Sequence, residues 1–244
     1  MVNSETLERF YQKVQELLWS ARKQTIELMN TPLKVDTKSS ANDLVTNVDR
    51  QNEQLIRKRL LEIDPSARIV GEEESFNHKI DPDLNGNVWI IDPIDGTLNF
   101  VKQRDHFAIM VALYCDGVPT LGYIMDVMNK RLYHAWRGHG AYVNKLRLKE
   151  PANSSLADSL IAINGWQLIK NHCHQQEIAQ QAAGLRMYGS AGIEIIHVLN
   201  GQLGGYTSRL KPWDIAAGMV IAEELGLLVK TIDDQPLNVL SSNT

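Results

Sequence analysis

A run of apolar residues that ends directly in two carboxylates constrains this chain more than any other feature. The run, Val88 to Ile91, is typical of a buried strand, and Asp92 and Asp95 follow it at once. A buried, unpaired carboxylate is costly, so the fold has to supply positive charge beside both acids. Pro93 and Gly96 are turn residues, but a turn alone does not require the apolar run in front of it. The segment therefore predicts a cation site at the end of a strand.

The residue types favour magnesium. Carboxylates and a backbone carbonyl are hard oxygen ligands, which suit Mg²⁺ better than a softer metal. Because the proline between them fixes the backbone, we expect Asp92 and Asp95 to face one small volume with the Ile94 carbonyl between them. Gly96 and Thr97 would then open a short helix whose N–H groups bind a phosphate.

Three further acidic clusters follow or begin predicted elements. Glu72 begins a run of three glutamates after an apolar strand, where a solvated loop is the alternative interpretation. Asp214 lies in the first turn of a predicted helix, which is an ordinary helix-start feature. Thr46 and Asp49 form a capping-box pattern. Taken one at a time, these acids fit structural roles.

Composition excludes several classes of protein. The chain has 244 residues, 43% of them hydrophobic, so it can bury one large core or two modest ones. A net charge of −4 and a pI near 6.0 argue against a nucleic-acid partner. Cys115 and Cys173 form no C-x-x-C pair, and the longest apolar run, 107–115, is too short to span a bilayer. The N-terminus has no signal pattern, so the chain is predicted to be soluble and cytoplasmic, without a membrane partner.

Apolar periodicity predicts helices first and a sheet next. Helices are expected over 5–29, with Ser4 as its N-cap, and over 48–63. Apolar runs on both sides of 116–117 and of 137–138 predict a largely antiparallel sheet, with both helices on one face. Beyond it the expected elements alternate: strands 159–163, 185–189, 201–207 and 227–233, and helices 167–183, 190–199 and 212–226. Two layered subdomains, about 1–150 and 151–244, are expected within one compact unit.

Three of these motifs, in this order, resemble the inositol monophosphatase family. They are Gly71-Glu72-Glu73, the segment WIIDPIDGT at 89–97, and WDIAAG at 213–218. The family belongs to the Mg²⁺-dependent, lithium-sensitive phosphatases, which include the fructose-1,6-bisphosphatases. The resemblance spans roughly residues 5–240 and implies an α/β (α+β) fold, a five-layered α-β-α-β-α sandwich. It implies a single catalytic unit over 1–244, usually homodimeric, that hydrolyses small phosphate monoesters. It also implies that family members continue into a further strand and helix.

The resemblance also implies roles for individual residues. Two to three Mg²⁺ ions would be held by Glu72, Asp92, the Ile94 carbonyl, Asp95 and Asp214. Thr97 would orient the nucleophilic water, with Asp49 accepting its hydroxyl proton and Glu72 completing the catalytic set. The substrate would contact Lys38, Asp95, Gly96, Thr97, Ser190, Ala191, Thr207 and Arg209.

The substrate within this class is left open. Inositol-specific members usually carry a glutamate where this chain has Thr207. Arg209 and Lys211 could pair with a second phosphate, as in fructose-1,6-bisphosphate or NADP, or they are ordinary surface charges. An inositol-1-phosphate-like monoester is the leading prediction, with fructose-1,6-bisphosphatase or NADP phosphatase as the alternatives.

Two more distant interpretations stand beside it. In aspartyl-phosphate phosphatases a D-x-D-G-T motif also follows a strand, but its acids are two residues apart, whereas Asp92 and Asp95 are three apart. A non-catalytic phosphosugar sensor would keep the fold and lose a metal ligand or the threonine, yet all of these residues are present in this sequence.

Overall fold

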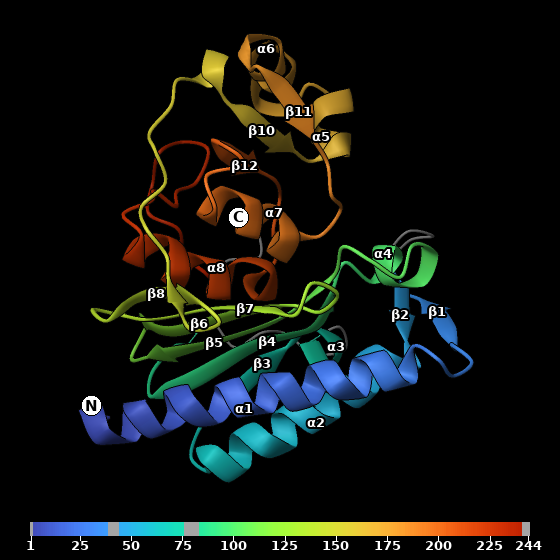
Figure 1. The fold of residues 1–244 in the computed structure, drawn as a ribbon, viewed down its shortest axis with the longest axis vertical. Coiled ribbons are helices and arrows are strands. Elements are labelled where there is room, and N and C mark those ends of the chain that lie inside the picture. Colours follow the sequence, from blue (N-terminus) through green and yellow to red (C-terminus); the bar gives the residue numbers. More distant parts are fainter. Residues whose placement is uncertain (1, 39–43, 76–82, 241–244) are drawn as a thin grey trace.

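Two long helices cover one face of a large sheet. The computed structural model describes residues 2–38, 44–75 and 83–240, and Figure 1 shows helices α1 (Ser4–Leu28) and α2 (Asn47–Ile63) lying side by side beneath this sheet. Apolar side chains of both helices pack against Trp89 and Ile91 of the sheet in one buried cluster. The predicted N-cap of the first helix is wrong, because Asn3 takes that place and its side chain accepts the Thr6 N–H at 2.8 Å.

The large sheet is almost entirely antiparallel, as predicted. Its strands run in the order β3-β4-β5-β6-β7-β8-β9, and only β3 and β4 are parallel neighbours. The strands are β3 (Arg68–Gly71), β4 (Asn87–Asp95), β5 (Ala108–Cys115), β6 (Val118–Asp126), β7 (Arg131–Trp136), β8 (Gly140–Val143) and β9 (Leu146–Arg147). The long central strands β4, β5 and β6 are buried on both faces, so helices have to cover the sheet on both sides.

Short elements surround the edge of this sheet where the acids lie. Strands β1 (Val35–Thr37) and β2 (Leu44–Thr46) pair antiparallel just before α2. The helical turn α3 (Glu72–Ser75) follows β3, and α4 (Thr97–Lys102) follows β4. The acidic segment after β3 therefore starts a helical turn, which is more ordered than the solvated loop that was its alternative.

The second half of the chain adds the remaining layers. Figure 1 shows α7 (Ala191–Leu199) and α8 (Pro212–Glu224) between the large sheet and a small parallel sheet of order β11-β10-β12. The outer face of the small sheet carries α5 (Gly165–Ile169) and α6 (Gln175–Gln181). The small sheet consists of β10 (Leu160–Ile163), β11 (Gly184–Arg186) and β12 (Gly205–Thr207), and the 3₁₀ turns are η1 (Leu156–Asp158) and η2 (His172–His174). The predicted five-layered α-β-α-β-α sandwich is confirmed.

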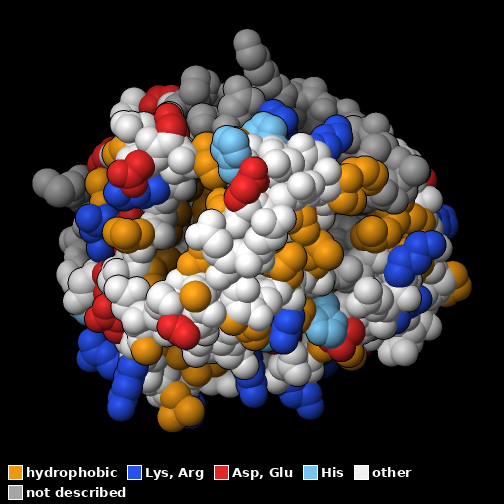
Figure 2. Space-filling view, turned by 90° about the horizontal axis from the view of Figure 1, so that it is seen from above, with side chains coloured by type: hydrophobic (Ala, Val, Ile, Leu, Met, Phe, Trp, Pro, Cys, Tyr) orange, Lys and Arg blue, Asp and Glu red, His pale blue; other side chains and the backbone are white. Residues whose placement is uncertain are grey.

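The outermost layer carries exposed hydrophobic side chains. Figure 2 views this end of the molecule from above and shows hydrophobic side chains at the surface among charged ones. Trp166 and Ile169 of α5 and Met187 after β11 are each more than half exposed. Within the described ranges, no helix is long and apolar enough to cross a membrane.

Two predictions in this half are wrong. The helix expected over 167–183 is broken, because Asn171, Cys173 and His174 adopt left-handed backbone with φ of 49°, 51° and 59°. Asparagine and histidine tolerate that region better than most residues, and the apolar spacing here is too weak to hold one continuous helix. The strand expected over 227–233 has one bridge, between Lys230 and Pro236. Leu227 and Val229 still pack against the buried core that the large sheet shares with α8, whereas Leu228 is 83% exposed.

A glycine in β6 determines how closely α8 approaches the large sheet. A Cβ atom on Gly122 would lie 2.6 Å from the Ala217 carbonyl oxygen and 2.7 Å from the Val220 Cβ. Both neighbours are buried in α8, so neither can move aside cheaply. The position of this helix, which brings Asp214 to the sheet, thus depends on a side chain being absent.

We expect Gly122→Ala to destabilise the protein by about 1–3 kcal/mol, because it overpacks the contact between α8 and β6. For a chain of this size the Tm should fall by about 2–4 °C for each kcal/mol, measured by thermal unfolding. Gly205→Ala is the matched control, since a Cβ there has no atom within 4 Å. Equal Tm values for the two variants would contradict the packing argument.

Candidate metal and catalytic site

A bulge near the end of β4 presents the two acids. The sequence placed them after the strand, but β4 continues to Asp95 and its pairing with β5 shifts between Asp92 and Asp95. Asp92 lies opposite Met110 and Asp95 opposite Ala108, so β4 has one residue more than its partner. Pro93 fits at this point because it has no N–H to donate to the ladder. The extra residue lets both carboxylates leave the strand toward the same region.

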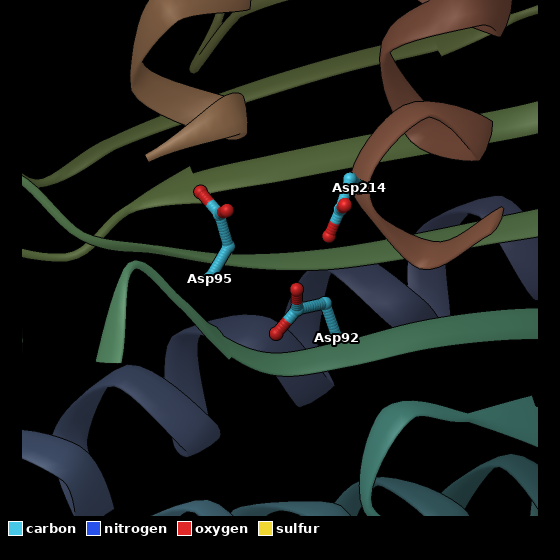
Figure 3. Close-up of side chains that lie close together, drawn as sticks. All are labelled: Asp92, Asp95 and Asp214. Atoms are coloured by element: carbon cyan, nitrogen blue, oxygen red, sulfur yellow. The ribbon is translucent and has the colours of Figure 1, made fainter. Parts of the chain in front are cut away.

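Three aspartates converge there from two distant segments. One carboxylate oxygen from each of Asp92, Asp95 and Asp214 lies within 4.8 Å of the others. Figure 3 shows their side chains pointing toward a common space, with Asp92 and Asp95 on β4 and Asp214 at the start of α8. Asp92 is 1% exposed and Asp95 is 6% exposed. The predicted metal ligands Asp92, Asp95 and Asp214 are therefore together in the fold.

The electrostatics of this cluster call for a cation. Burial, followed by the carboxylates of Glu72 and Asp95, raises the pKa of Asp92 well above its usual range. Burial and Asp95 do the same to the pKa of Asp214. Burial also raises the pKa of Asp95, although hydrogen bonds oppose the shift. A divalent ion would remove this cost, and the all-oxygen donor set fits Mg²⁺.

Glu72 is close to this cluster and is paired with a buried lysine. Lys38 Nζ lies 2.8 Å from Glu72 Oε1 and 2.6 Å from Glu73 Oε1, and the lysine side chain is only 4% exposed. Burial raises the pKa of Glu72 to about 6, with Lys38 opposing the shift. Burial lowers the pKa of Lys38, but Glu72 and Glu73 together outweigh burial and the net shift of this pKa is upward. Lys38, predicted to contact the substrate, contacts Glu72, a predicted metal ligand.

The hydroxyl of Thr97 lies beside a fixed carboxylate. Thr97 Oγ1 is 2.9 Å from Asp49 Oδ1 and 3.0 Å from the Ile94 carbonyl oxygen. Asp49 is itself held by Thr46, whose N–H donates to Asp49 Oδ2 at 2.9 Å and whose hydroxyl donates to the same oxygen. This is the predicted capping box, with both of its hydrogen bonds. Asp49 thus caps α2 with one oxygen and receives Thr97 with the other.

Asp95 also connects the large sheet to α7. Its carboxylate accepts the Ala191 N–H at 3.0 Å, the Gly192 N–H at 2.8 Å and the Ser190 hydroxyl at the start of α7. Gly96, with φ of 87°, has left-handed backbone, and a Cβ there would lie 2.8 Å from the Ser190 Cβ. Only glycine fits this place. Ser190 and Ala191, predicted to contact the substrate, contact Asp95 in the structure.

The remaining predicted substrate residues lie on the side of the small sheet. Thr207 ends β12, where its hydroxyl accepts the Gln175 amide N–H at 3.2 Å and its carbonyl accepts the Asn164 N–H at 3.1 Å. Arg209 follows on the segment between β12 and α8. These contacts tie Thr207 to the beginnings of α5 and α6.

Sequence reasoning missed two residues that hold the segment before α7. The Asn99 amide donates to the carbonyls of His106 at 2.9 Å and Tyr188 at 2.6 Å. Glu194 is 5% exposed and accepts the Tyr188 N–H at 2.6 Å. Glu194 could have been recognised from the sequence, because it is an acid within an otherwise apolar helical run. No sequence pattern distinguishes Asn99 from a surface residue.

Known proteins are similar to this chain over most of its length. A family model described as the inositol monophosphatase family matches residues 6–244. An inositol-1-monophosphatase of Bacillus subtilis (strain 168) is 40% identical over 221 residues, which cover 88% of this chain and 83% of the relative.

Solved structures show the same architecture. A dual-specific IMPase/NADP phosphatase bound with D-inositol-1-phosphate is 31% identical, with a TM-score of 0.85 over 96% of this chain and 88% of that one. A staphylococcal inositol monophosphatase-1, described as an inhibitory complex soaked in 100 mM LiCl, is 32% identical. Its TM-score is 0.89 over 98% of this chain and 89% of that one.

The raised pKa values of the aspartates predict a pH dependence of stability. An acid whose pKa is higher in the folded state does not reduce the free energy of unfolding below its unfolded pKa, about 3.9. As the pH rises from there through the folded pKa, the acid increasingly destabilises the folded protein. In EDTA the protein should therefore lose stability as the pH rises above about 4. Mg²⁺ should restore the loss and raise the Tm most at neutral pH.

Asp92→Asn tests whether Asp92 is a metal ligand, because the variant should change the Tm in opposite directions without and with Mg²⁺. It should raise the Tm in EDTA at neutral pH, because it removes one buried negative charge, and it should abolish the rise in Tm produced by Mg²⁺. Asp234→Asn is the control, since that side chain is 82% exposed. A variant that keeps the full Mg²⁺ response would exclude Asp92 as a metal ligand.

Proposed function

Because the chain belongs to the inositol monophosphatase family, we propose that it hydrolyses inositol-1-phosphate or a similar small phosphate monoester with Mg²⁺. It is a phosphatase of this family. The observation that carries the proposal is the convergence of Asp92, Asp95 and Asp214 next to a hydroxyl–carboxylate pair. This family match also favours a metal-dependent phosphatase over an aspartyl-phosphate enzyme.

The residues around the cluster would hold the metal. Asp92, Asp95 and Asp214 would bind the ions, with Glu72 and the Ile94 carbonyl completing the sites, and two to three ions are proposed. Mg²⁺ would supply a nucleophilic hydroxide at neutral pH and stabilise charge on the leaving oxygen. Because Lys38 Nζ lies 2.8 Å from Glu72 Oε1, the Glu72 carboxylate would have to bind the metal while it is paired with Lys38, or give up that pairing.

Thr97 would orient the attacking water. Its hydroxyl donates its proton to a fixed acceptor, and the hydrogen bond to the Asp49 carboxylate is the stronger of its two options because it is charge-assisted. The lone pairs of Thr97 Oγ1 are then left to accept a hydrogen bond from water. We propose that the N–H groups of Gly96, which has left-handed backbone, and of Thr97 bind the phosphoryl oxygens.

The leaving group is the least constrained part of the substrate. Thr207 replaces the glutamate expected of inositol-specific members, and Arg209 lies on the segment that leads to α8. The similar dual-specific IMPase/NADP phosphatase shows that one such protein can combine both activities. We propose the same breadth here, with inositol-1-phosphate as the leading substrate and NADP and fructose-1,6-bisphosphate as alternatives.

Phosphate release with Mg²⁺ from inositol-1-phosphate, fructose-1,6-bisphosphate, NADP and 3′-phosphoadenosine phosphate tests this proposal. We expect the highest kcat/KM for inositol-1-phosphate, and no release with EDTA. Release from none of the substrates would favour the sensor interpretation instead. A preference for a bisphosphate or NADP would keep the chemistry and correct the substrate.

Thr97→Val should lower kcat by about 100-fold or more while KM changes little, because the water and not the substrate loses its partner. Steady-state kinetics at saturating Mg²⁺ measure both constants. Thr97→Ser is the control, since it keeps the hydroxyl beside Asp49 and should retain most of the activity. A large rise in KM with kcat intact would assign Thr97 to substrate binding alone.

Finer properties follow from family membership and from the surface. We propose a homodimer, supported by the exposed Trp166, Ile169 and Met187, and a monomeric mass by light scattering would contradict it.

Lithium inhibition is proposed from the similar structure in its LiCl-soaked inhibitory complex. A cytoplasmic location is proposed from the absence of paired cysteine motifs in the sequence.

A further inference from the structure

A buried acid on α2 holds the backbone that carries Glu72. Glu53 is 4% exposed, and its Oε2 accepts the Glu73 N–H at 2.8 Å. Four residues along the same helix, the Arg57 guanidinium donates to the Ile69 carbonyl at 3.3 Å and lies 3.8 Å from Glu53 Oε1. Glu72 therefore lies between two backbone contacts, both of which come from one face of α2.

The backbone of β3 leaves room for this carboxylate. A Cβ atom on Gly71 would lie 2.7 Å from Glu53 Oε1 and 2.8 Å from its Cδ. Gly71 pairs in register with Ile91 of β4, so the strand cannot shift away from the helix without leaving the sheet. The absence of a side chain at residue 71 is what allows Glu53 to reach the Glu73 N–H.

The same helix also holds the other half of the site. Asp49, one turn before Glu53, receives the Thr97 hydroxyl at 2.9 Å. Asn52, between them, is fully buried and lies 3.5 Å from the Pro93 carbonyl, on the bulge that separates the two acids of β4. One rigid helix thus contacts the Glu72 segment, the acidic bulge and the threonine, and it keeps their spacing constant.

We propose that Glu53 is a positioning residue that fixes Glu72 for metal binding through the Glu73 N–H. The inference rests on the proposed function, because it needs Glu72 as a metal ligand. Glu53 itself is not among the residues predicted to bind the metal or the substrate. Its loss leaves a buried N–H without an acceptor and frees the turn that carries Glu72.

Calorimetric titration with Mg²⁺ in the absence of substrate tests the inference directly. Glu53→Met, which keeps the size and removes the acceptor, should weaken Mg²⁺ binding by about 10- to 100-fold. Glu53→Gln keeps an acceptor oxygen for the Glu73 N–H, so its loss of Mg²⁺ affinity should stay below the roughly 10-fold expected when such a partner is removed. Substrate KM at saturating Mg²⁺ should not change in either variant.

Gly71 provides a second, independent route to the same contact. Gly71→Ala should weaken Mg²⁺ binding because the new Cβ displaces the Glu53 carboxylate. In a Glu53→Ala background, where the carboxylate is already gone, Gly71→Ala should have no further effect on Mg²⁺ binding. Such non-additivity identifies the contact even if Glu53→Met folds poorly.

The control is Glu62→Gln, on the same helix, where an exposed carboxylate pairs with Arg59 at 2.9 Å and should not affect Mg²⁺ binding. Wild-type affinity in Glu53→Met, or additive losses in the double variant, would overturn the inference. Failure of the wild type itself to bind Mg²⁺ would instead refute the proposed function, so the two failures are distinguishable.

Discussion

Repulsion among buried carboxylates is the constraint on which the rest of the structure depends. Asp92, Asp95 and Asp214 share a space within 4.8 Å, and each has a raised pKa because of burial. Hydrogen bonds from backbone N–H groups hold the carboxylates of Asp95 and Asp214 in place despite this repulsion. Asp95 receives the N–H groups that begin α7, and Asp214 receives the Lys211 N–H at 2.7 Å. The remaining negative charge is what a divalent ion would neutralise.

Hydrogen bonds to neighbouring elements make this cluster rigid as well as acidic. Three elements that carry site residues, α3, β4 and α4, meet the polar face of α2. The cluster is thereby tied to the face of the large sheet that α1 and α2 cover, and Asp214 reaches it from the opposite face on α8. Catalytic geometry needs this kind of support, because small displacements of ligands have large effects on rate.

The sequence predicted the strongly periodic parts of the fold and the residues around which the site is built. Helices α1 and α2 and the hairpins around Asp116 and Arg137 were identified because long apolar periods outweigh local propensity. The acidic motif of β4 was recognised, but its bulge was not, because a register shift leaves no mark in hydropathy. The break in the outer helix and the single bridge in the segment after α8 were missed for a related reason. Left-handed residues and the pairing of one strand with another also leave no mark in hydropathy.

The glycine contact between β6 and α8 has a consequence for how this architecture can diversify. Because Gly122 meets the Ala217 carbonyl directly, backbone rather than side chains sets the depth at which α8 docks and hence where Asp214 lies. The small sheet and its outer helices connect to that assembly through the segments that lead into α7 and α8. Substitutions on their surfaces would therefore change the contacts to a proposed substrate without moving Asp214. The residues that would bind a metal and those that would select the substrate could then change independently of one another.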